Sequence, residues 1–537
     1  MPPVQPVNKP ILCNPYTEPT EYWAYDTQTG DARREAGRRP ASYWYKTQRT
    51  GSAQLQLGFM AEEERDDLPL INALRDDVRR WRASGYEGAT RVTRQLLAHW
   101  VRPDRPRRLF FCQVEAVETI IYINEILASG RKPRFSPKLS PNDFARLRQG
   151  ERPQDLAGVL AESRFFPALV DQPADPVIPP LTRYGCKMAT GSGKTVVMAM
   201  LIAWAFCNRG RTPSDERFPA AALVVCPNLT IKERLQVLRP DSPDDYYTAF
   251  KIIPAQLMPE LKKGKVLVTN WHRFNPESPH SEGGKTYTVV NKGEEGPDAF
   301  ARRVLGDLYE RAPLMVLNDE AHHAYRPAQI AKSEKLSADA KSEREEATVW
   351  VAGLDRINTA CGVRFCVDLS ATPFYLGGSG YIEGSPLPWL ISDFGLVDAI
   401  ESGIVKIPRL PVSDTTGRPD PKYFKLWQSI TAGLQPGEKL PGGKPKPEVV
   451  WREAEDALAT LASQYKERFQ IVQGATPGGA ALARCGEHLG PTRSLGIPRL
   501  HGSTAAPDRA RADCETPLGM TTTRYEPNNA LRTRTLA

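Results

Sequence analysis

The sequence predicts an α/β fold built on a parallel sheet, and three patterns support this prediction. A glycine-rich turn at residues 188–195 leads directly into an apolar run at 196–207. From residue 183 to about 375, short apolar runs alternate with helical stretches, which is the pattern of βα units. One of these runs, Leu314–Asn318, ends in a pair of carboxylates. A glycine-rich loop, its helix and an acidic strand end are therefore expected on one sheet.

Composition is that of a globular protein. The 537 residues suit about three domains, and contents of 40% hydrophobic and 25% charged residues are ordinary. The net charge of +8 permits a polyanionic partner without specifying one. The nine cysteines show no C-x-x-C spacing, so neither a zinc site nor a disulfide framework is indicated. Without a signal segment or a long apolar span, we expect a cytoplasmic protein with no membrane contact.

The loop Met188–Thr195 has the features of a phosphate cradle, although its first residue is methionine where the strict pattern has glycine. Gly191 and Gly193 let backbone N–H groups converge on an anion at a helix N-terminus. Lys194 can reach the β- and γ-phosphates, and the hydroxyl of Thr195 suits Mg²⁺. The predicted nucleotide-binding residues of the loop are Thr190, Gly191, Ser192, Gly193, Lys194 and Thr195.

A candidate base-binding residue precedes this loop. Apolar residues at helical spacing over 110–121 predict a helix that contains Gln113. Its amide carries both a donor and an acceptor, which can match the edge of adenine. We therefore expect Gln113 to bind the base of ATP, with an exposed helical glutamine as the alternative.

The carboxylates after Leu314–Asn318 indicate the chemistry. Asp319 and Glu320 at the end of a buried strand are costly unless they serve a metal or a proton. We assign Asp319 to Mg²⁺ and Glu320 to the general base that activates water. His322 is expected at a domain interface, relaying the nucleotide state, and His323 is expected to be a polar neighbour. The alternative is a capped helix start.

Hydroxyl residues follow another predicted strand. The runs predicted as strands are Ala222–Cys226, Lys265–Thr269, Leu314–Asn318 and Arg364–Leu369. Ser370, Ala371 and Thr372 come directly after the last of these, where they can hydrogen-bond back to the acidic pair. We interpret them as coupling residues that respond to the γ-phosphate.

The remaining regions are less informative. Residues 1–60 predict an irregular extension, and 61–108 a charged helical region whose arginine cluster suits phosphates or solvent equally. Residues 130–182 predict an insertion, and 275–297 a surface loop. Residues 447–470 predict a helix with one face formed by Ala454, Leu458, Leu461 and Tyr465.

In order along the chain, the motifs resemble those of superfamily-two DEAH-type helicases. They are Gln113, the loop Ala-Thr-Gly-Ser-Gly-Lys-Thr at 189–195, Asp-Glu-Ala-His at 319–322 and Ser-Ala-Thr at 370–372. More narrowly, the chain resembles the Res subunit of type III restriction enzymes over residues 1–470. The segments that carry this second resemblance are 18–23, 39–45, 188–195, 370–375 and 393–406.

The resemblance implies a RecA-like P-loop ATPase lobe that uses ATP and Mg²⁺ to move along duplex DNA. It also implies a separate nuclease domain, a role in a restriction system and a DNA methyltransferase subunit as a partner. The domains expected on this basis are an accessory region at 1–107, the ATP-binding lobe at 108–405, the start of a second lobe at 406–471 and a low-order tail at 472–537.

By the same resemblance, two loops would lie along the DNA. Pro227, Asn228 and Thr230 follow one predicted strand, and Thr269 and Asn270 end the next. Backbone amides and hydroxyls there would contact phosphates, which positions a duplex without reading its sequence.

Two parts of the family pattern are missing after residue 400. The sequence contains no Gln-x-x-Gly-Arg motif and no Pro-Asp…(Asp/Glu)-x-Lys cluster there. After Val472 the composition shifts to Ala, Gly, Arg, Pro and Thr without a periodic apolar face. We interpret the chain as truncated, with the reading frame lost near residue 471.

Two functions stay open on this sequence: an active motor, and an ATP- and DNA-binding remnant without turnover. A transport or signalling ATPase is disfavoured.

Overall fold

The computed structural model describes residues 7, 9–26, 29–46, 63–130, 134–154, 156, 165–275, 295–329, 336–406, 426–432, 434–435, 437–440 and 443–475. The chain divides into two compact units, Met1–Pro408 and Arg409–Ala537. Nearly all of the expected tail and most of the expected loop at 275–297 lie outside the described residues. Within the described part, no helix is long and apolar enough to cross a membrane.

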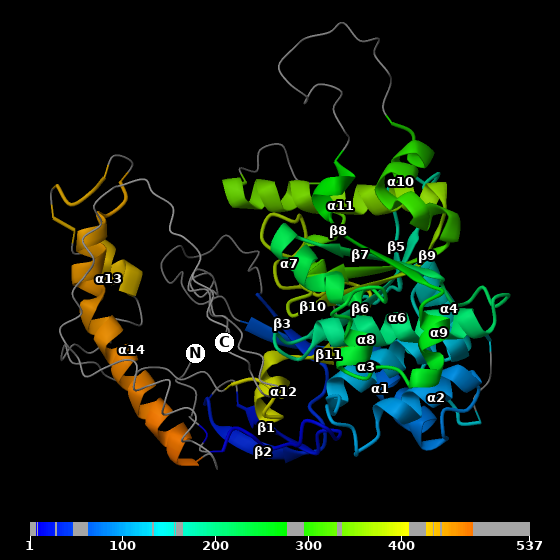
Figure 1. The fold of residues 1–537 in the computed structure, drawn as a ribbon, viewed down its shortest axis with the longest axis horizontal. Helices are drawn as coiled ribbons and strands as arrows, with labels where there is room; N and C mark the ends of the chain where they lie inside the picture. The colour runs from blue at the N-terminus through cyan, green and yellow to red at the C-terminus, as the bar shows by residue number, and fades with distance from the viewer. Residues whose placement is uncertain are drawn as a thin grey trace, which may run out of the picture. The chain divides into compact units, whose positions relative to one another are not determined.

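The first unit is organised around a seven-stranded sheet (Figure 1). Its strands are β5 (Val170–Asp171), β6 (Leu181–Met188), β7 (Ala221–Cys226), β8 (Lys265–Asn270), β9 (Leu314–Asp319), β10 (Val363–Ser370) and β11 (Leu390–Phe394). The order is β11-β6-β10-β9-β7-β8, and β5 pairs antiparallel with the start of β6. All other pairings are parallel. The predicted α/β fold and the four predicted strands are confirmed.

Helices cover both faces of this sheet (Figure 1). One face carries α1 (Pro69–Ala83), α2 (Arg91–Trp100), α3 (Phe111–Ile121) and α6 (Lys194–Arg211), and the other carries α10 (Pro297–Leu305) and α11 (Ala338–Ala360). On β7, Ala222 and Val224 join the first core, whereas Leu223 and Val225 join the second. Burial on both faces explains why the strand is continuously apolar.

Shorter elements connect these layers. They are η1 (Tyr122–Leu127), α4 (Pro141–Gln149), α7 (Leu229–Arg234), η2 (Leu235–Leu238), α8 (Tyr246–Ala249), η3 (Ala255–Leu257), α9 (Met258–Leu261), η4 (Trp271–Phe274), η5 (Gly306–Arg311), η6 (Ala321–His323) and α12 (Leu396–Glu401). The helix predicted at 196–207 is α6, which is buried on nearly every side. A helix that is apolar all round belongs in a core.

The N-terminal residues form strands, which corrects two expectations. β1 (Glu21–Tyr25) pairs antiparallel with β2 (Ala32–Ala36), and β3 (Ser42–Lys46) pairs antiparallel with β4 (Glu63–Asp67). The irregular extension expected over 1–60 and the helix expected from residue 61 are therefore wrong at these positions. Because β1 and β2 are half-buried or exposed along most of their length, they lack the apolar alternation that marks a strand.

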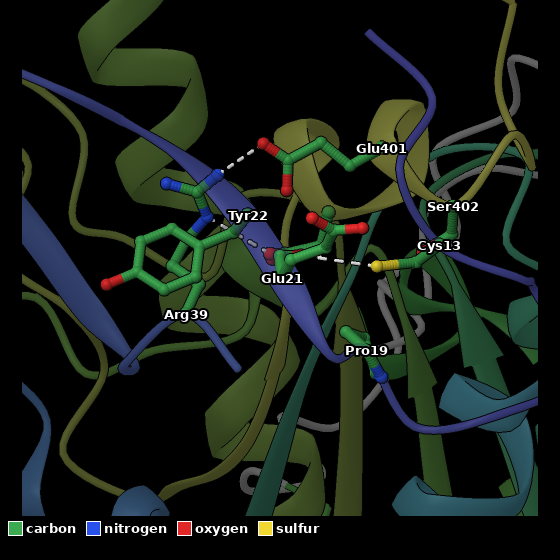
Figure 2. Close-up of a pocket in the computed structure, with 8 residues that line it drawn as sticks. Cys13, Pro19, Glu21, Tyr22, Arg39, Glu401 and Ser402 are labelled. Carbon is green, nitrogen blue, oxygen red and sulfur yellow. Dashed lines mark hydrogen bonds and ion pairs between the residues drawn. The ribbon is translucent and has the colours of Figure 1, made fainter. Parts of the chain in front are cut away.

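This N-terminal segment is attached to α12, as Figure 2 shows. The backbone N–H of Cys13 donates to the carbonyl of Glu401 at 2.9 Å, and that of Trp23 donates to the Glu401 carboxylate at 3.0 Å. Arg39 pairs with Glu401 at 2.6 Å and with Asp398 at 3.3 Å. The small pocket in Figure 2 therefore lies between the N-terminal segment and α12, and residues of the segments 18–23, 39–45 and 393–406 line most of it.

The second unit contains α13 (Leu426–Ala432) and α14 (Pro447–Ala475), which pack on each other. The helix predicted at 447–470 is confirmed and extends to Ala475. The four residues predicted to share a face lie at helical spacing on this helix; Ala454 is buried, whereas Leu458 is 43% exposed and Tyr465 is 71% exposed. The side chain of Leu461 lies outside the described residues. Because α13 is only seven residues long, it covers a short stripe of α14.

Candidate active site

Parallel pairing brings the predicted motifs to one edge of the sheet. β6 ends at Met188 before the phosphate loop, β9 ends at Asp319 and β10 ends at Ser370. β10 lies between the other two strands, with Leu369 opposite Asp319 and Ser370 opposite Lys187. Ligands of open α/β sheets bind at this carboxyl edge.

The phosphate loop makes a tight turn into α6. Gly191 and Gly193 have φ angles of +86° and +88°, which residues with a Cβ rarely adopt. The hydroxyl of Ser192 donates to the carbonyl of Ala189 at 2.7 Å, which closes the turn. The loop therefore has the left-handed glycines and the following helix that its pattern predicts.

An ion pair joins this loop to the acidic motif. The Nζ of Lys194 lies 2.7 Å from the Oε1 of Glu320. The two side chains are 12% and 28% exposed, so the pair is largely shielded from solvent. Glu320 has a φ of +51°, a left-handed conformation that costs about 1 kcal/mol or more in a residue with a side chain. Strain of this kind persists where the surrounding structure imposes it, and such sites are often functional.

Asp319 has the surroundings of a cation ligand. It is 8% exposed, and burial followed by the charge of Glu320 raises its pKa to about 6. A carboxylate buried beside a second carboxylate favours a nearby cation. Asp319 and the hydroxyl of Thr195, on the first turn of α6, fit Mg²⁺, which takes few protein oxygens and completes its shell with water and phosphate. In the described part of the chain, no group of three or more His, Cys, Asp or Glu is placed to hold a metal ion.

His322 connects the acidic motif with the hydroxyl residues. Its Nδ1 lies 2.9 Å from the Oγ of Ser370 and 3.6 Å from the Oε2 of Glu320. The backbone N–H of Thr372 also donates to the Ser370 Oγ, at 3.0 Å, with Ala371 in the turn between them. Burial lowers the pKa of His322 to about 3, so the imidazole is neutral. The hydroxyl of Ser370, which we expected to bond the acidic pair, is thus bonded to His322 instead.

Gln113 is buried against the phosphate loop. Its side chain is 4% exposed. The Nε2 donates to the carbonyl of Ser192 at 2.9 Å, and the Oε1 accepts from the backbone N–H of Phe110 at 2.9 Å. Both polar atoms of the amide are therefore engaged within the protein, and the contact with the base of ATP stays a prediction.

The loops predicted to contact DNA follow the adjacent strands β7 and β8. Asn228 is exposed, but its side chain caps α7 by accepting a backbone N–H at 2.9 Å. Thr230 is exposed and Pro227 is half-buried. Thr269 is 2% exposed and Asn270 is 9% exposed, so the hydroxyl of Thr269 is not presented to a ligand.

Sequence reasoning missed a buried ion network beneath this edge. Arg183 on β6 is 0% exposed and donates to Asp368 at 2.7 Å, to Asp171 at 3.0 Å and to the carbonyl of Ala324 at 2.6 Å. Asp368 also accepts from Asn318 at 2.7 Å. The signal in the sequence was a single charged residue, Asp368, inside the predicted strand Arg364–Leu369.

Residues 175–375 match the family model of the type III restriction enzyme res subunit. This region is therefore a domain of that type, called the ResIII domain below. The ResIII domain contains the phosphate loop, the acidic motif and Ser370–Thr372, and it is an ATP-binding helicase domain. Gln113 and helices α1 to α3 precede it. Neither the curated proteins nor the solved structures include a significant match to the chain.

Proposed function

We propose that the chain is the ATP-dependent DNA helicase or translocase part of a type III-like restriction endonuclease, which hydrolyses ATP on duplex DNA. The observation that best supports the proposal is the 2.7 Å contact between Lys194 and Glu320, because it unites the phosphate loop and the acidic motif in one site. Duplex DNA is the expected partner, together with a DNA methyltransferase subunit.

In the proposed reaction, the N–H groups of the phosphate loop bind the phosphates of ATP. Lys194 leaves Glu320 for the β- and γ-phosphates, which frees the carboxylate. Glu320 then orients the water that attacks the γ-phosphorus and accepts its proton, while the bond from the γ-phosphorus to the bridging oxygen breaks and ADP leaves. Asp319 and Thr195 would hold Mg²⁺, which neutralises phosphate charge when bound. His322 and Ser370 transmit the resulting change to β10.

The second candidate is an ATP- and DNA-binding remnant without turnover. It is favoured for the isolated chain by the lack of a Gln-x-x-Gly-Arg motif after residue 400. An arginine at the γ-phosphate contributes a factor of about 10³ or more in rate. The first candidate therefore requires another arginine in this chain or one from a partner.

Lys194→Ala separates these candidates. We expect ATP turnover by the purified chain to rise with duplex DNA and to fall at least about a hundredfold in the variant, because the positive charge that stabilises the transferred phosphate is lost. Lys265→Ala is the matched control, since that exposed lysine pairs with Asp307 on the surface. ATP binding with no turnover above that of the variant would support the remnant, and the absence of ATP binding would contradict both candidates.

Ser370→Ala tests the coupling role. Removing the hydroxyl that contacts His322 is expected to lower DNA-stimulated turnover about fivefold, the equivalent of a hydrogen bond of about 1 kcal/mol, with basal turnover unchanged. Ser385→Ala, which removes a hydroxyl bonded to an exposed turn, is the control. An equal loss of basal and stimulated turnover would show that Ser370 has only a structural role.

A further inference from the structure

An arginine-rich loop connects α2 with α3. Residues 102–108 of this loop read Arg-Pro-Asp-Arg-Pro-Arg-Arg, a pattern that suits phosphates or solvent equally. Arg102 pairs with Asp104 at 2.9 Å, so these two charges offset each other. Arg107 and Arg108 are exposed, and in the described part of the chain no carboxylate pairs with either of them. The loop therefore presents positive charge that its own carboxylate does not neutralise.

A buried arginine fixes the course of this loop. Arg105 is 8% exposed, and its guanidinium donates to three backbone carbonyls, those of His99 at 3.2 Å, Arg107 at 3.3 Å and Phe250 at 2.8 Å. Burial, followed by the charge of Arg102, lowers the pKa of Arg105. A buried cation that is held by carbonyls keeps its charge, and an anion bound above it would compensate that charge.

The segment after α8 adds a third cation beside the loop. Lys251 is exposed and has a φ of +49°, which residues with a Cβ rarely adopt. The Nε2 of His99 lies 2.8 Å from the carbonyl oxygen of Lys251, and the N–H of Lys251 donates to the carbonyl of Thr248 at 3.2 Å. Among the described residues, no carboxylate pairs with this lysine. Contacts with α2 therefore fix Lys251 next to Phe250, which the loop also contacts.

Aromatic rings support the two exposed arginines. The guanidinium of Arg107 lies 4.9 Å from the centre of the Phe250 ring, and that of Arg108 lies 4.1 Å from the centre of the Tyr16 ring. Each ring also packs on a second aromatic side chain, Tyr246 for Phe250 and Phe110 for Tyr16. These rings are thus occupied by neighbours rather than offered to unpaired bases. The surface suits the phosphates of a duplex better than the bases of a single strand.

We propose that Arg107, Arg108 and Lys251 form a binding surface for the phosphate backbone of duplex DNA. The inference rests on the proposed function, which supplies the DNA. The surface lies apart from the loops after β7 and β8, on the sheet face that carries α2 and α6, where Phe250 packs on the core (Figure 1). A duplex carries about one negative charge per 1.7 Å of its axis, so uncompensated cations attract it whatever its sequence.

The test measures binding of the full chain, without nucleotide, to two fluorescent duplexes of unrelated sequence over a range of salt concentrations. In the triple variant Arg107→Gln/Arg108→Gln/Lys251→Gln, the affinity for both duplexes is expected to fall at least about tenfold. The slope of log K against log salt concentration is expected to become shallower by about 2 to 3, because each lost phosphate contact contributes about 0.9.

A second triple variant, Lys265→Gln/Arg302→Gln/Arg311→Gln, is the matched control. It removes the same charge from three exposed side chains around η5, two of which pair with carboxylates of η5. Its affinity is expected to change less than about threefold, because charges outside the contact are screened. Thermal unfolding shows that both triple variants are folded.

Three results would overturn the inference. They are an unchanged salt slope in the first triple variant, equal weakening in both triple variants, and weakening confined to one of the two duplexes, which would indicate contacts with bases. In each of these the wild type still binds duplex DNA, so the proposed function stands. A wild type that binds neither duplex would instead contradict the DNA partner of the proposed function, and the inference with it.

Discussion

Glu320→Gln is expected to abolish most of the ATP turnover of the chain while leaving ATP binding nearly unchanged. The substitution keeps the size of the side chain and an oxygen that can accept from Lys194, but it removes the basic carboxylate. A positioned general base contributes a factor of about 10² to 10⁴, so kcat is expected to fall at least about a hundredfold. Phosphate release at saturating ATP with duplex DNA measures turnover, and a direct titration measures ATP affinity.

The control for this variant is Glu401→Gln. Glu401 is also a partly buried carboxylate in an ion pair, with Arg39 at 2.6 Å, but it lies at the N-terminal pocket (Figure 2). Turnover is expected to be unchanged in it. A Glu320→Gln chain that retained more than about a tenth of wild-type turnover would contradict the role of base. Loss of ATP binding would instead mean that Glu320 mainly holds Lys194 and the loop.

The motif residues could be predicted because their signals are local. Gly191 and Gly193 stand where the backbone has positive φ, and the apolar runs before Asp319 and Ser370 are buried strands. Parallel pairing then brings strand ends together without further information from the sequence. For the same reason the α/β fold followed from the order of apolar runs alone.

The partners of those residues could not be predicted, because they depend on packing between distant segments. Gln113 was assigned to a base on the chemistry of its amide, yet its donor meets a loop carbonyl. The hydroxyl of Ser370 reaches His322, which the short turn η6 places over the end of β10. Thr269 looked accessible at a strand end but is covered.

The N-terminal strands escaped prediction for a different reason. β1 and β2 are stabilised by pairing with each other and by ion pairs such as that between Arg34 and Glu21. Neither strand has a fully buried face, so neither carries an apolar pattern of period two. Their position follows from polar contacts with α12, and polar contacts leave no periodic signal in a sequence.

Arg183→Met is expected to lower the free energy of unfolding by about 3 to 5 kcal/mol, the usual cost of removing one partner from a buried ion pair. Burial lowers the pKa of Arg183, but Asp368 and Asp171 raise it to a net value above the ordinary one, so the guanidinium is charged. It lies 4.0 Å above the ring of Trp389 and is fully paired. Methionine fills the space but leaves the carboxylate of Asp368 buried without its cation.

Arg326 is a second cation for Asp171, so Asp171 stays paired when Arg183 is replaced. It donates to Asp171 at 2.7 Å and forms two bonds with Asp355, at 2.6 and 2.7 Å. Asp171 therefore keeps a cation when Arg183 is removed, whereas among the described residues Asp368 keeps the amide of Asn318 alone. The uncompensated charge of the Arg183→Met chain is expected to reside on Asp368.

A second substitution at Asp368 tests this assignment. The double variant Arg183→Met/Asp368→Asn removes the charge but keeps an oxygen for Asn318, and it is expected to recover at least about 1 kcal/mol relative to Arg183→Met. Urea unfolding of the wild type, both single variants and the double variant closes the cycle. Arg302→Met, on the surface, is the control and should leave stability unchanged, because exposed ion pairs contribute little. Additive effects in the cycle would show that Arg183 and Asp368 are not coupled, and the ion network would then not hold β6 and β10 together.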